Sequence, residues 1–286
     1  MFSLKDTYHA IFGVANQDSI CWSIAECIRA AGGEVVLISH PAIVRKGRLQ
    51  KIASSIGIHD IFPCDVSDAE SMEECFKKLA GYAPFDGVVH GIAFSNKDEL
   101  RGRFVDTTAD NFKETLEISA HSLTAIAHRM ERMMPNGGSI LTLTFDAWEG
   151  TYPNYNVMAQ AKAALRTGML YLAADFGEGN IRVNAVSASP EDTPSARGIG
   201  NFRLIGKFAE AMSPMRRRAT KDEIAKTAVF LLGPGSTGIT GQTIYVDCGA
   251  SSSTMPPARN ADLMAEAMAS IAETYQKELP DDEKTD

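Results

Sequence analysis

The alternation of short apolar runs with longer amphipathic segments constrains the fold of this sequence more than any other feature. The runs are apolar at consecutive positions, which is typical of strands that helices cover on both faces. Strands separated by helices favour parallel neighbours joined by right-handed crossovers. The sequence therefore predicts an α/β fold with a single doubly wound parallel sheet of Rossmann type and helices on both faces. The expected strands are 8–14, 34–39, 59–64, 87–92, 139–145, 181–187 and 243–246, and the expected helices are 19–31, 45–56, 69–80, 109–134, 153–176 and 221–232.

One domain is expected to hold most of the chain, because no internal repeat or linker interrupts residues 1–250. We predict a single Rossmann-type domain over 1–255. Segment 189–213 follows the sixth expected strand and is rich in Pro and Gly, a setting in which long segments often form a lid over a ligand. Residues 256–286 are expected to form a helix near 260–276 and an acidic, solvated tail.

A ligand site is predicted where the first strand ends. Gly13 permits a tight turn there, and the helix after Ser19 and Ile20 can present free N–H groups to a pyrophosphate. The spacing is not the usual GxGxxG pattern, and a glycine followed by a serine N-cap is common in proteins that bind no nucleotide. Asp65 follows the third strand and also fits either a ligand contact or a helix cap. Its position at the carboxyl edge of the sheet favours the ligand.

Tyr155 and Lys162 form the most specific pattern in the sequence. Seven helical steps turn through about 700°, nearly two full turns, so both side chains are expected on one helix face. The ammonium can hold the ribose of a cofactor while the phenol donates to a substrate carbonyl. Taken alone, the pair is better explained by a buried helix with an incidental tyrosine and an extended lysine.

The order of these motifs resembles the short-chain dehydrogenase/reductase superfamily. Many members place the tyrosine and lysine with three residues between them. The six residues here, in the context Pro-Asn-Tyr-Asn-Val-Met, resemble the divergent branch of bacterial NADH-dependent enoyl-acyl-carrier-protein reductases. The resemblance covers about residues 1–255 and also includes Cys64-Asp65-Val66, Arg182-Val183-Asn184-Ala185 and Val246-Asp247.

The resemblance implies a cytoplasmic homotetramer that uses NADH to reduce the trans-2 double bond of a fatty acyl thioester. It makes Tyr155 the donor to the thioester oxygen and Lys162 the residue that holds the cofactor ribose. The implied cofactor-binding residues are Gly13, Ser19, Ile20, His40, Asp65, Val66, Ile92, Ala93, Lys162 and Thr193. The implied walls of the acyl pocket are Phe94, Phe145, Met158, Pro190, Ala196, Ile199, Phe202 and Ile205.

Four positions depart from the family pattern. Phe145 stands where many relatives have a second tyrosine, although others of the branch have phenylalanine. Ala93 stands where glycine is common, and its extra methyl group is expected to narrow the nicotinamide pocket. Glu191 and Asp192 place two acids near the expected pyrophosphate, where they would weaken binding unless both face solvent. We expect them to face solvent.

The residues expected to contact the carrier protein and the cofactor ribose also differ from the family pattern. The lid keeps two cations for docking an acidic carrier, Arg203 and Lys207, fewer than its relatives. The second strand ends at His40 without the acid that typically holds a ribose 2′-hydroxyl. A nearby basic cluster could meet a 2′-phosphate or lie on the helix surface, so NADH is expected and NADPH stays open. This cluster consists of Arg45, Lys46 and Arg48.

Composition limits the remaining partners. The formal net charge of −8 argues against nucleic acid and anionic membranes. No signal peptide or apolar run of membrane-spanning length is present, five dispersed cysteines fit a reducing compartment, and the histidines form no metal-ligand pattern. Two alternatives to the carrier-linked enoyl substrate remain. One is a reductase of the same fold acting on a CoA-linked or specialised thioester or a carbonyl compound, and the other is a non-catalytic dinucleotide-binding subunit.

Overall fold

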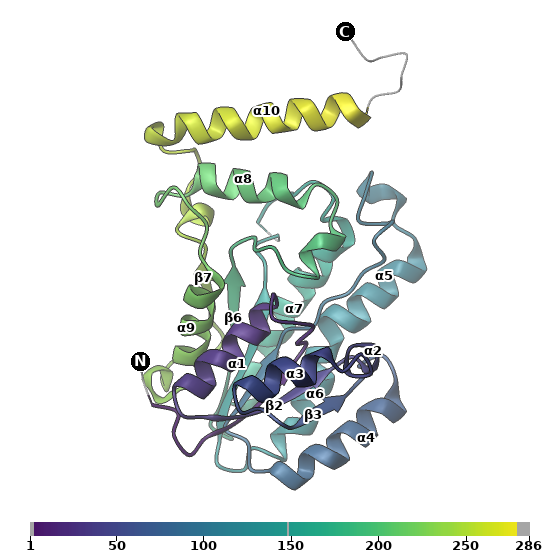
Figure 1. Cartoon of the computed structure of the whole chain (residues 1–286), viewed down its shortest axis with the longest axis vertical. Helices are drawn as coiled ribbons and strands as arrows, with labels where there is room; N and C mark the ends of the chain where they lie inside the picture. Colours follow the sequence, from purple (N-terminus) through teal and green to yellow (C-terminus); the bar gives the residue numbers. More distant parts are fainter. Residues whose placement is uncertain (1–2, 148, 279–286) are drawn as a thin grey trace.

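A computed structural model describes residues 3–147 and 149–278. Within them, seven parallel strands form a single sheet in the order β3-β2-β1-β4-β5-β6-β7 (Figure 1). The predicted doubly wound α/β fold is therefore confirmed. The strands are β1 (Tyr8–Phe12), β2 (Glu34–Ser39), β3 (Ile61–Pro63), β4 (Gly87–His90), β5 (Gly138–Thr144), β6 (Ile181–Ala188) and β7 (Thr243–Val246).

Helices cover both faces of this sheet. Buried side chains of α1, α3 and α9 pack on one face, and those of α4, α6 and α7 pack on the other. The helices are α1 (Ile20–Ala30), α2 (Pro41–Val44), α3 (Arg48–Ser55), α4 (Ala69–Leu79), α5 (Ala109–Leu116), α6 (Ser122–Glu131), α7 (Asn156–Phe176), α8 (Phe202–Met212), α9 (Lys221–Leu232) and α10 (Ala261–Glu278). Short 3₁₀ helices lie at Ala80–Tyr82, Phe104–Asp106, Ala196–Gly198, Pro234–Ser236, Ala250–Ser252 and Ala258–Asn260.

The strands are apolar on both sides because they contribute to two cores. In β2, Val36 and Ile38 belong to the core beneath α4, whereas Val35 and Leu37 belong to the core beneath α1. All four side chains are buried. Burying a valine or leucine side chain stabilises the fold by about 1.5–3 kcal/mol, so each position along these strands favours the double-sided arrangement.

The strand order reverses between β1 and β4, which places a crevice at the carboxyl ends of these two strands. The chain is tight there. Gly13 has a φ of +99°, and a Cβ on it would lie 2.4 Å from the carbonyl oxygen of Gly91. A Cβ on Gly91 would lie 2.0 Å from the sulfur of Cys21. Only glycines allow the backbone this close approach.

Three expected helices differ from those observed. The expected helix 45–56 is observed only as α3, which begins at Arg48 after the left-handed Gly47, and the short α2 precedes the expected range. The expected helix 109–134 is interrupted by a π-helical turn at Glu117–His121. The expected helix 153–176 begins at Asn156, so Tyr155 is its N-cap residue and does not belong to the first turn.

The lid and the C-terminal segment lie beyond the carboxyl end of the sheet. In Figure 1, α8 lies above the sheet and α10 runs above α8. The last expected residues of the acidic tail, 279–286, fall outside the described part of the chain.

Candidate active site

Two adjoining cavities follow the crevice between β1 and β4. One has a volume of about 340 Å³ and extends toward β3, and the other has about 480 Å³ and extends under the lid. Both are lined by Gly13, His40, Ile92 and Phe94, so they form one continuous cleft. Open α/β sheets bind ligands at this edge.

The smaller cavity contains several of the residues that were predicted to bind the cofactor. Asp65 and Val66 line it, beside His40. The Nε2 atom of His40 lies 3.3 Å from a carboxylate oxygen of Asp65, and Ser67 donates to the other oxygen through its backbone N–H and its hydroxyl. Partial burial raises the pKa of Asp65, but the hydrogen bonds from Ser67 and the nearby His40 outweigh it and lower the pKa. A carboxylate therefore stands at this end of the cleft.

The glycine loop between β1 and α1 forms the floor of the cleft. The hydroxyl oxygen of Ser19 accepts hydrogen bonds from the backbone N–H groups of Ala15 and Asn16, both at 3.1 Å. Ser19 and Ile20 line the larger cavity. Ser19 thus shapes the loop in addition to lining the cleft. Cys21, which sequence reasoning did not select, lines the same cavity because α1 begins one residue earlier.

The loop after β4 is held by a side chain that sequence reasoning did not select. The hydroxyl of Ser119, in the π-helical turn, donates to the carbonyl oxygen of Phe94 and accepts from its N–H, both at 2.9 Å. Ile92, Ala93 and Phe94 line both cavities. A π-helical turn often marks a functional site, but no residue pattern in 109–134 indicated its position.

Tyr155 and Lys162 both line the larger cavity, with Met158 between them on α7. Lys162 is 6% exposed, and its ammonium donates to the carbonyl oxygen of Leu143 at 3.0 Å. Burial lowers the pKa of Lys162 to about 8, partly opposed by Cys21. Tyr155 is 5% exposed, and burial raises the pKa of its phenol above the ordinary value. At neutral pH the pair presents an ammonium and a protonated phenol to one cavity.

Aromatic rings support Tyr155 from one side. The ring of Phe145 lies 5.2 Å from that of Tyr155 and 4.8 Å from that of Tyr152, centroid to centroid. Phe145 therefore packs the catalytic candidate in place and also lines the larger cavity. Aromatic pairs at such distances stabilise each other beyond the area that they bury.

Two buried hydroxyl groups fit a polar ligand in the larger cavity. Thr144 and Ser189 both line it, and among the described residues their hydroxyl oxygens have no hydrogen-bond partner. Leaving a buried hydroxyl without a partner costs about 1–3 kcal/mol. Together with the side-chain-free approach at Gly13 and the buried Lys162, these groups suit the phosphates, ribose and amide of a dinucleotide.

Most of the predicted lid residues line the larger cavity, and one does not. Thr193, Ala196, Ile199 and Phe202 line the larger cavity, as does Pro190. Ile205 is buried within the lid and lies apart from the lining residues, so its predicted place in the acyl wall is not the one that it occupies. It lies nearly one helical turn beyond Phe202, the last residue of the lid that lines the cavity.

The two acidic residues of the lid, Glu191 and Asp192, lie in different environments. Asp192 is exposed and pairs with Arg197 at 2.9 Å, and Arg197 also reaches Asp18 of the glycine loop at 3.4 Å. Glu191 instead lines the larger cavity, half-buried, so the expectation that both acids face solvent is wrong for Glu191. Burial raises the pKa of Glu191, and Arg218 and Lys221 oppose this.

The geometry defines a class of protein before any comparison is made. A dinucleotide-shaped cleft at the switch point, with a phenol and an ammonium facing an apolar wall, is the arrangement of a reductase that polarises a carbonyl oxygen. The family model described as Enoyl-(Acyl carrier protein) reductase matches residues 13–251 of this chain. The chain belongs to this family of oxidoreductases.

Individual relatives agree with the family model. A Rhizobium meliloti protein named as an NADH enoyl-acyl-carrier-protein reductase is 45% identical over 84% of this chain and 88% of its own length. The solved enoyl-acyl-carrier-protein reductase of Anaplasma phagocytophilum, in complex with NAD, aligns with a TM-score of 0.86 and 43% identity over 90% of this chain and 99% of that one. The Bacillus cereus enzyme with NADP⁺ and an indole naphthyridinone aligns with a TM-score of 0.83 and 40% identity over 87% and 98%.

Proposed function

We propose that this chain reduces the trans-2 double bond of enoyl thioesters carried by an acyl carrier protein, with NADH as the reductant, in fatty acid biosynthesis. The observation that carries the proposal is the buried pair of Tyr155 and Lys162 in one cavity with an apolar wall, in a chain of this family. The apolar wall suits an acyl chain, and the pair suits a thioester carbonyl beside a ribose.

The side chains divide the work. Tyr155 donates a hydrogen bond to the thioester oxygen, where negative charge develops as the β-carbon is reduced. Its raised pKa keeps the phenol protonated at neutral pH, so the donor stays in place. Lys162 holds the ribose hydroxyls and adds positive potential beneath the site. NADH, when bound, supplies the hydride.

The same residues exclude water from the reacting atoms. Ile199 and Phe202 of the lid line the larger cavity together with Met158 and Phe145. A water-poor site strengthens the hydrogen bond from Tyr155, because the local dielectric constant is low. The methyl group of Ala93 lies on the same lining and narrows the space beside the nicotinamide.

NADH fits the adenosine end better than NADPH. The expected basic cluster of Arg45, Lys46 and Arg48 is exposed and does not line either cavity. Asp65 and its partner His40 occupy that end instead. A 2′-phosphate there would meet a carboxylate at short range, whereas a 2′-hydroxyl can donate to it.

We further propose that the protein is a cytoplasmic homotetramer. Large apolar side chains are exposed on the outer sides of α5 and α7, and strand β7 forms an edge of the sheet. Contiguous exposed apolar side chains often mark contact surfaces. The side chains are Phe112, Leu170 and Tyr171. In the described part of the chain, no helix is both long and apolar enough to cross a membrane.

The test is NADH consumption by the purified protein with one medium-chain trans-2-enoyl group, linked in parallel to acyl carrier protein and to coenzyme A. We expect turnover with the carrier-linked substrate, and weaker turnover when NADPH replaces NADH. Turnover only with the coenzyme A ester would move the protein to another acyl donor. NADH binding without turnover on either thioester would overturn the proposed reaction.

A further inference from the structure

The lid helix α8 ends against a residue from the C-terminal segment. Asn260 is 0% exposed, and its side-chain N–H groups donate to the carbonyl oxygens of Ala211 at 2.8 Å and Ser213 at 2.7 Å. The last carbonyl groups of a helix have no partners within that helix. Asn260, far along the chain, supplies those partners to α8.

The turn after α8 is tied to the same segment. The side-chain oxygen of Asn260 lies 3.4 Å from a nitrogen of Arg216, which also pairs with Asp262 at 2.7 Å and donates to the carbonyl oxygen of Arg259. Arg259 in turn donates to the carbonyl oxygen of Pro214. The amide N–H groups and the amide oxygen of Asn260 are therefore all engaged. The ion pair of Arg216 with Asp262 holds the same segment as well.

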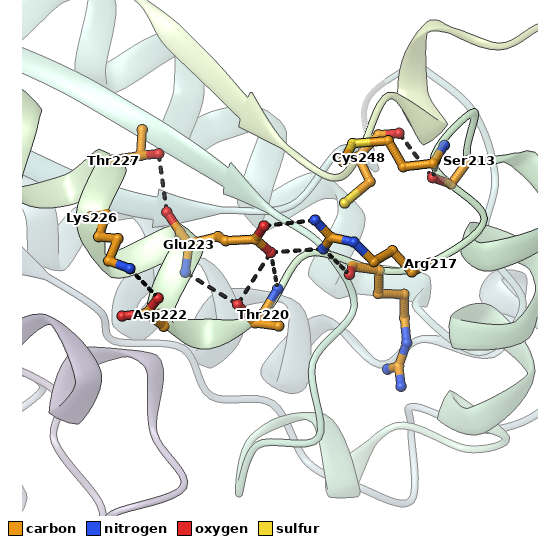
Figure 2. Close-up of polar contacts among 10 residues, drawn as sticks. Ser213, Arg217, Thr220, Asp222, Glu223, Lys226, Thr227 and Cys248 are labelled. Atoms are coloured by element: carbon orange, nitrogen blue, oxygen red, sulfur yellow. Dashed lines mark hydrogen bonds and ion pairs between the residues drawn. The ribbon is translucent and has the colours of Figure 1, made fainter.

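The body of the molecule holds the turn from the opposite direction. Figure 2 shows Ser213 donating to the carbonyl oxygen of Cys248, which follows β7. It also shows the guanidinium of Arg217 against the carboxylate of Glu223, in the first turn of α9. The C-terminal end of α8 is consequently fixed both to the sheet and to α10.

Along its length α8 is also bound to α10. The ammonium of Lys207 donates to the hydroxyl of Ser270 at 2.8 Å and lies 3.0 Å from a carboxylate oxygen of Glu266. Lys207 had been expected to meet an acidic carrier protein, but α10 engages it instead. Arg203, which is exposed, is the other cation that was expected to dock the carrier.

The opposite end of α8 carries the wall of the larger cavity. Phe202 is its first residue, and Ile199 lies just before it. A helix of this length moves as a rigid body, so a shift at its C-terminal end carries Phe202 with it. The bonds of Asn260 are thus connected to the acyl wall through α8.

We propose that Asn260 is a positioning residue for the acyl wall, and that it acts through α8. This inference rests on the proposed enoyl thioester reduction. Asn260 and α10 follow residue 251, the last residue that the family model matches. The segment after the family domain thus sets the geometry of the lid.

The experiment uses the full chain with Asn260→Ala and measures steady-state kinetics with NADH and a medium-chain trans-2-enoyl thioester. We expect KM for the thioester to rise about tenfold, since two buried hydrogen bonds are lost, while kcat and KM for NADH change less than about twofold. Asn260→Asp keeps the acceptor for Arg216 and removes the donors, so it should match the alanine variant. Glu266→Gln, at the exposed pair, should shift the same KM by about twofold.

Thr274→Ala is the matched control, because within the described part of the chain the Thr274 hydroxyl bonds only inside α10, to the carbonyl oxygen of Ser270. It should leave every constant unchanged. If Asn260→Ala instead lowered kcat about tenfold and left KM for the thioester unchanged, the proposal would be overturned. Asn260 would then be merely structural.

Amide hydrogen exchange supplies a second measurement that needs no substrate. In Asn260→Ala, exchange should become faster in residues 202–213 and stay unchanged in α9. Unchanged exchange in 202–213 would also overturn the proposal. A wild-type chain inactive on enoyl thioesters would overturn the proposed function instead, and the exchange comparison would still decide the role of Asn260.

Discussion

The two walls of the cleft are built in different ways. The cofactor wall consists of backbone at the ends of β1 and β4, packed so closely that Gly13 and Gly91 leave no space for a Cβ. The lid wall is held by side chains, including the exposed pairs of Arg197 and the bonds of Asn260. A backbone contact cannot yield to a substitution, whereas a side-chain contact can rearrange. We therefore expect small changes in the first wall to have larger effects than large changes in the second.

Gly13→Ala should have the largest effect. The added methyl group would meet a backbone carbonyl at 2.4 Å, and φ at this position is +99°. We expect the free energy of unfolding to fall by about 3 kcal/mol and NADH affinity to fall at least about 100-fold. Denaturant unfolding and fluorescence titration with NADH would measure the two effects.

Two other glycines separate the causes of this effect. Gly47 has a φ of +66° but no atom within 4 Å of its Cβ position, and Gly238 has neither constraint. Gly47→Ala should therefore show the conformational strain alone, and Gly238→Ala should show almost no loss. If Gly13→Ala lost no more than Gly47→Ala, the close approach to Gly91 would not be what makes this wall rigid.

Tyr155→Phe should have the next largest effect, because Tyr155 stands where the two walls meet. Removal of one preorganised donor to a developing oxyanion lowers kcat by about 100- to 1,000-fold. NADH affinity should change less than about twofold, since the ring still packs on Phe145. Tyr152→Phe, which keeps the stack with Phe145, is the control. Equal losses of kcat and NADH affinity in Tyr155→Phe would make this tyrosine structural.

Lys162 gives the cofactor wall a pH dependence. Burial lowers its pKa to about 8, so above that pH the cofactor-free protein loses the ammonium that we propose holds the ribose. We expect the Kd for NADH to rise about tenfold between pH 7 and pH 9.

The contribution of Lys162 to the stability of the cofactor-free protein changes with pH in the opposite direction. Between about pH 8 and the ordinary value of 10.5 the unfolded chain binds more protons, so the free energy of unfolding rises with pH.

Lys162→Met is the control for this prediction. It should bind NADH weakly at every pH, and its Kd should not change between pH 7 and pH 9. Titration of both proteins with NADH across this range would measure the difference. If the Kd of Lys162→Met changed with pH in the same way, a titratable group other than Lys162 would be the cause.

The sequence predicted the cofactor wall better than the lid, for a physical reason. Gly13 and Asp65 follow parallel strands, and topology alone brings such residues to one edge. Tyr155 and Lys162 were paired by helical phase, and both line the larger cavity although Tyr155 lies just before α7. Long-range side-chain contacts carry no such periodic signal. Ser119 was missed because a π-helical turn aims it at Phe94.

The lid shows the same limit. Glu191 was expected in solvent, but it follows Pro190 in an irregular segment and lines the larger cavity. Lys207 was assigned to a carrier protein because nothing in the sequence indicated that α10 would pack beside α8. These outcomes depend on where segments far apart in the chain meet. Periodicity and strand ends do not record that information.

Arg197→Ala should have the smallest effect and so tests the weaker wall. Arg197 joins Asp192 of the lid to Asp18 of the glycine loop across the mouth of the cleft, and all three side chains are exposed. Exposed pairs contribute little and are screened by salt, so we expect the Kd for NADH to rise only about twofold to threefold at low ionic strength. The difference should vanish in about 0.5 M salt, where charges more than a few ångströms apart are screened.

Arg45→Ala is the control, because it removes an equal charge from a side chain outside both cavities and should leave the Kd unchanged. A tenfold loss in Arg197→Ala that persists in high salt would mean that the lid wall is as rigid as the cofactor wall, and the contrast between the two would not hold.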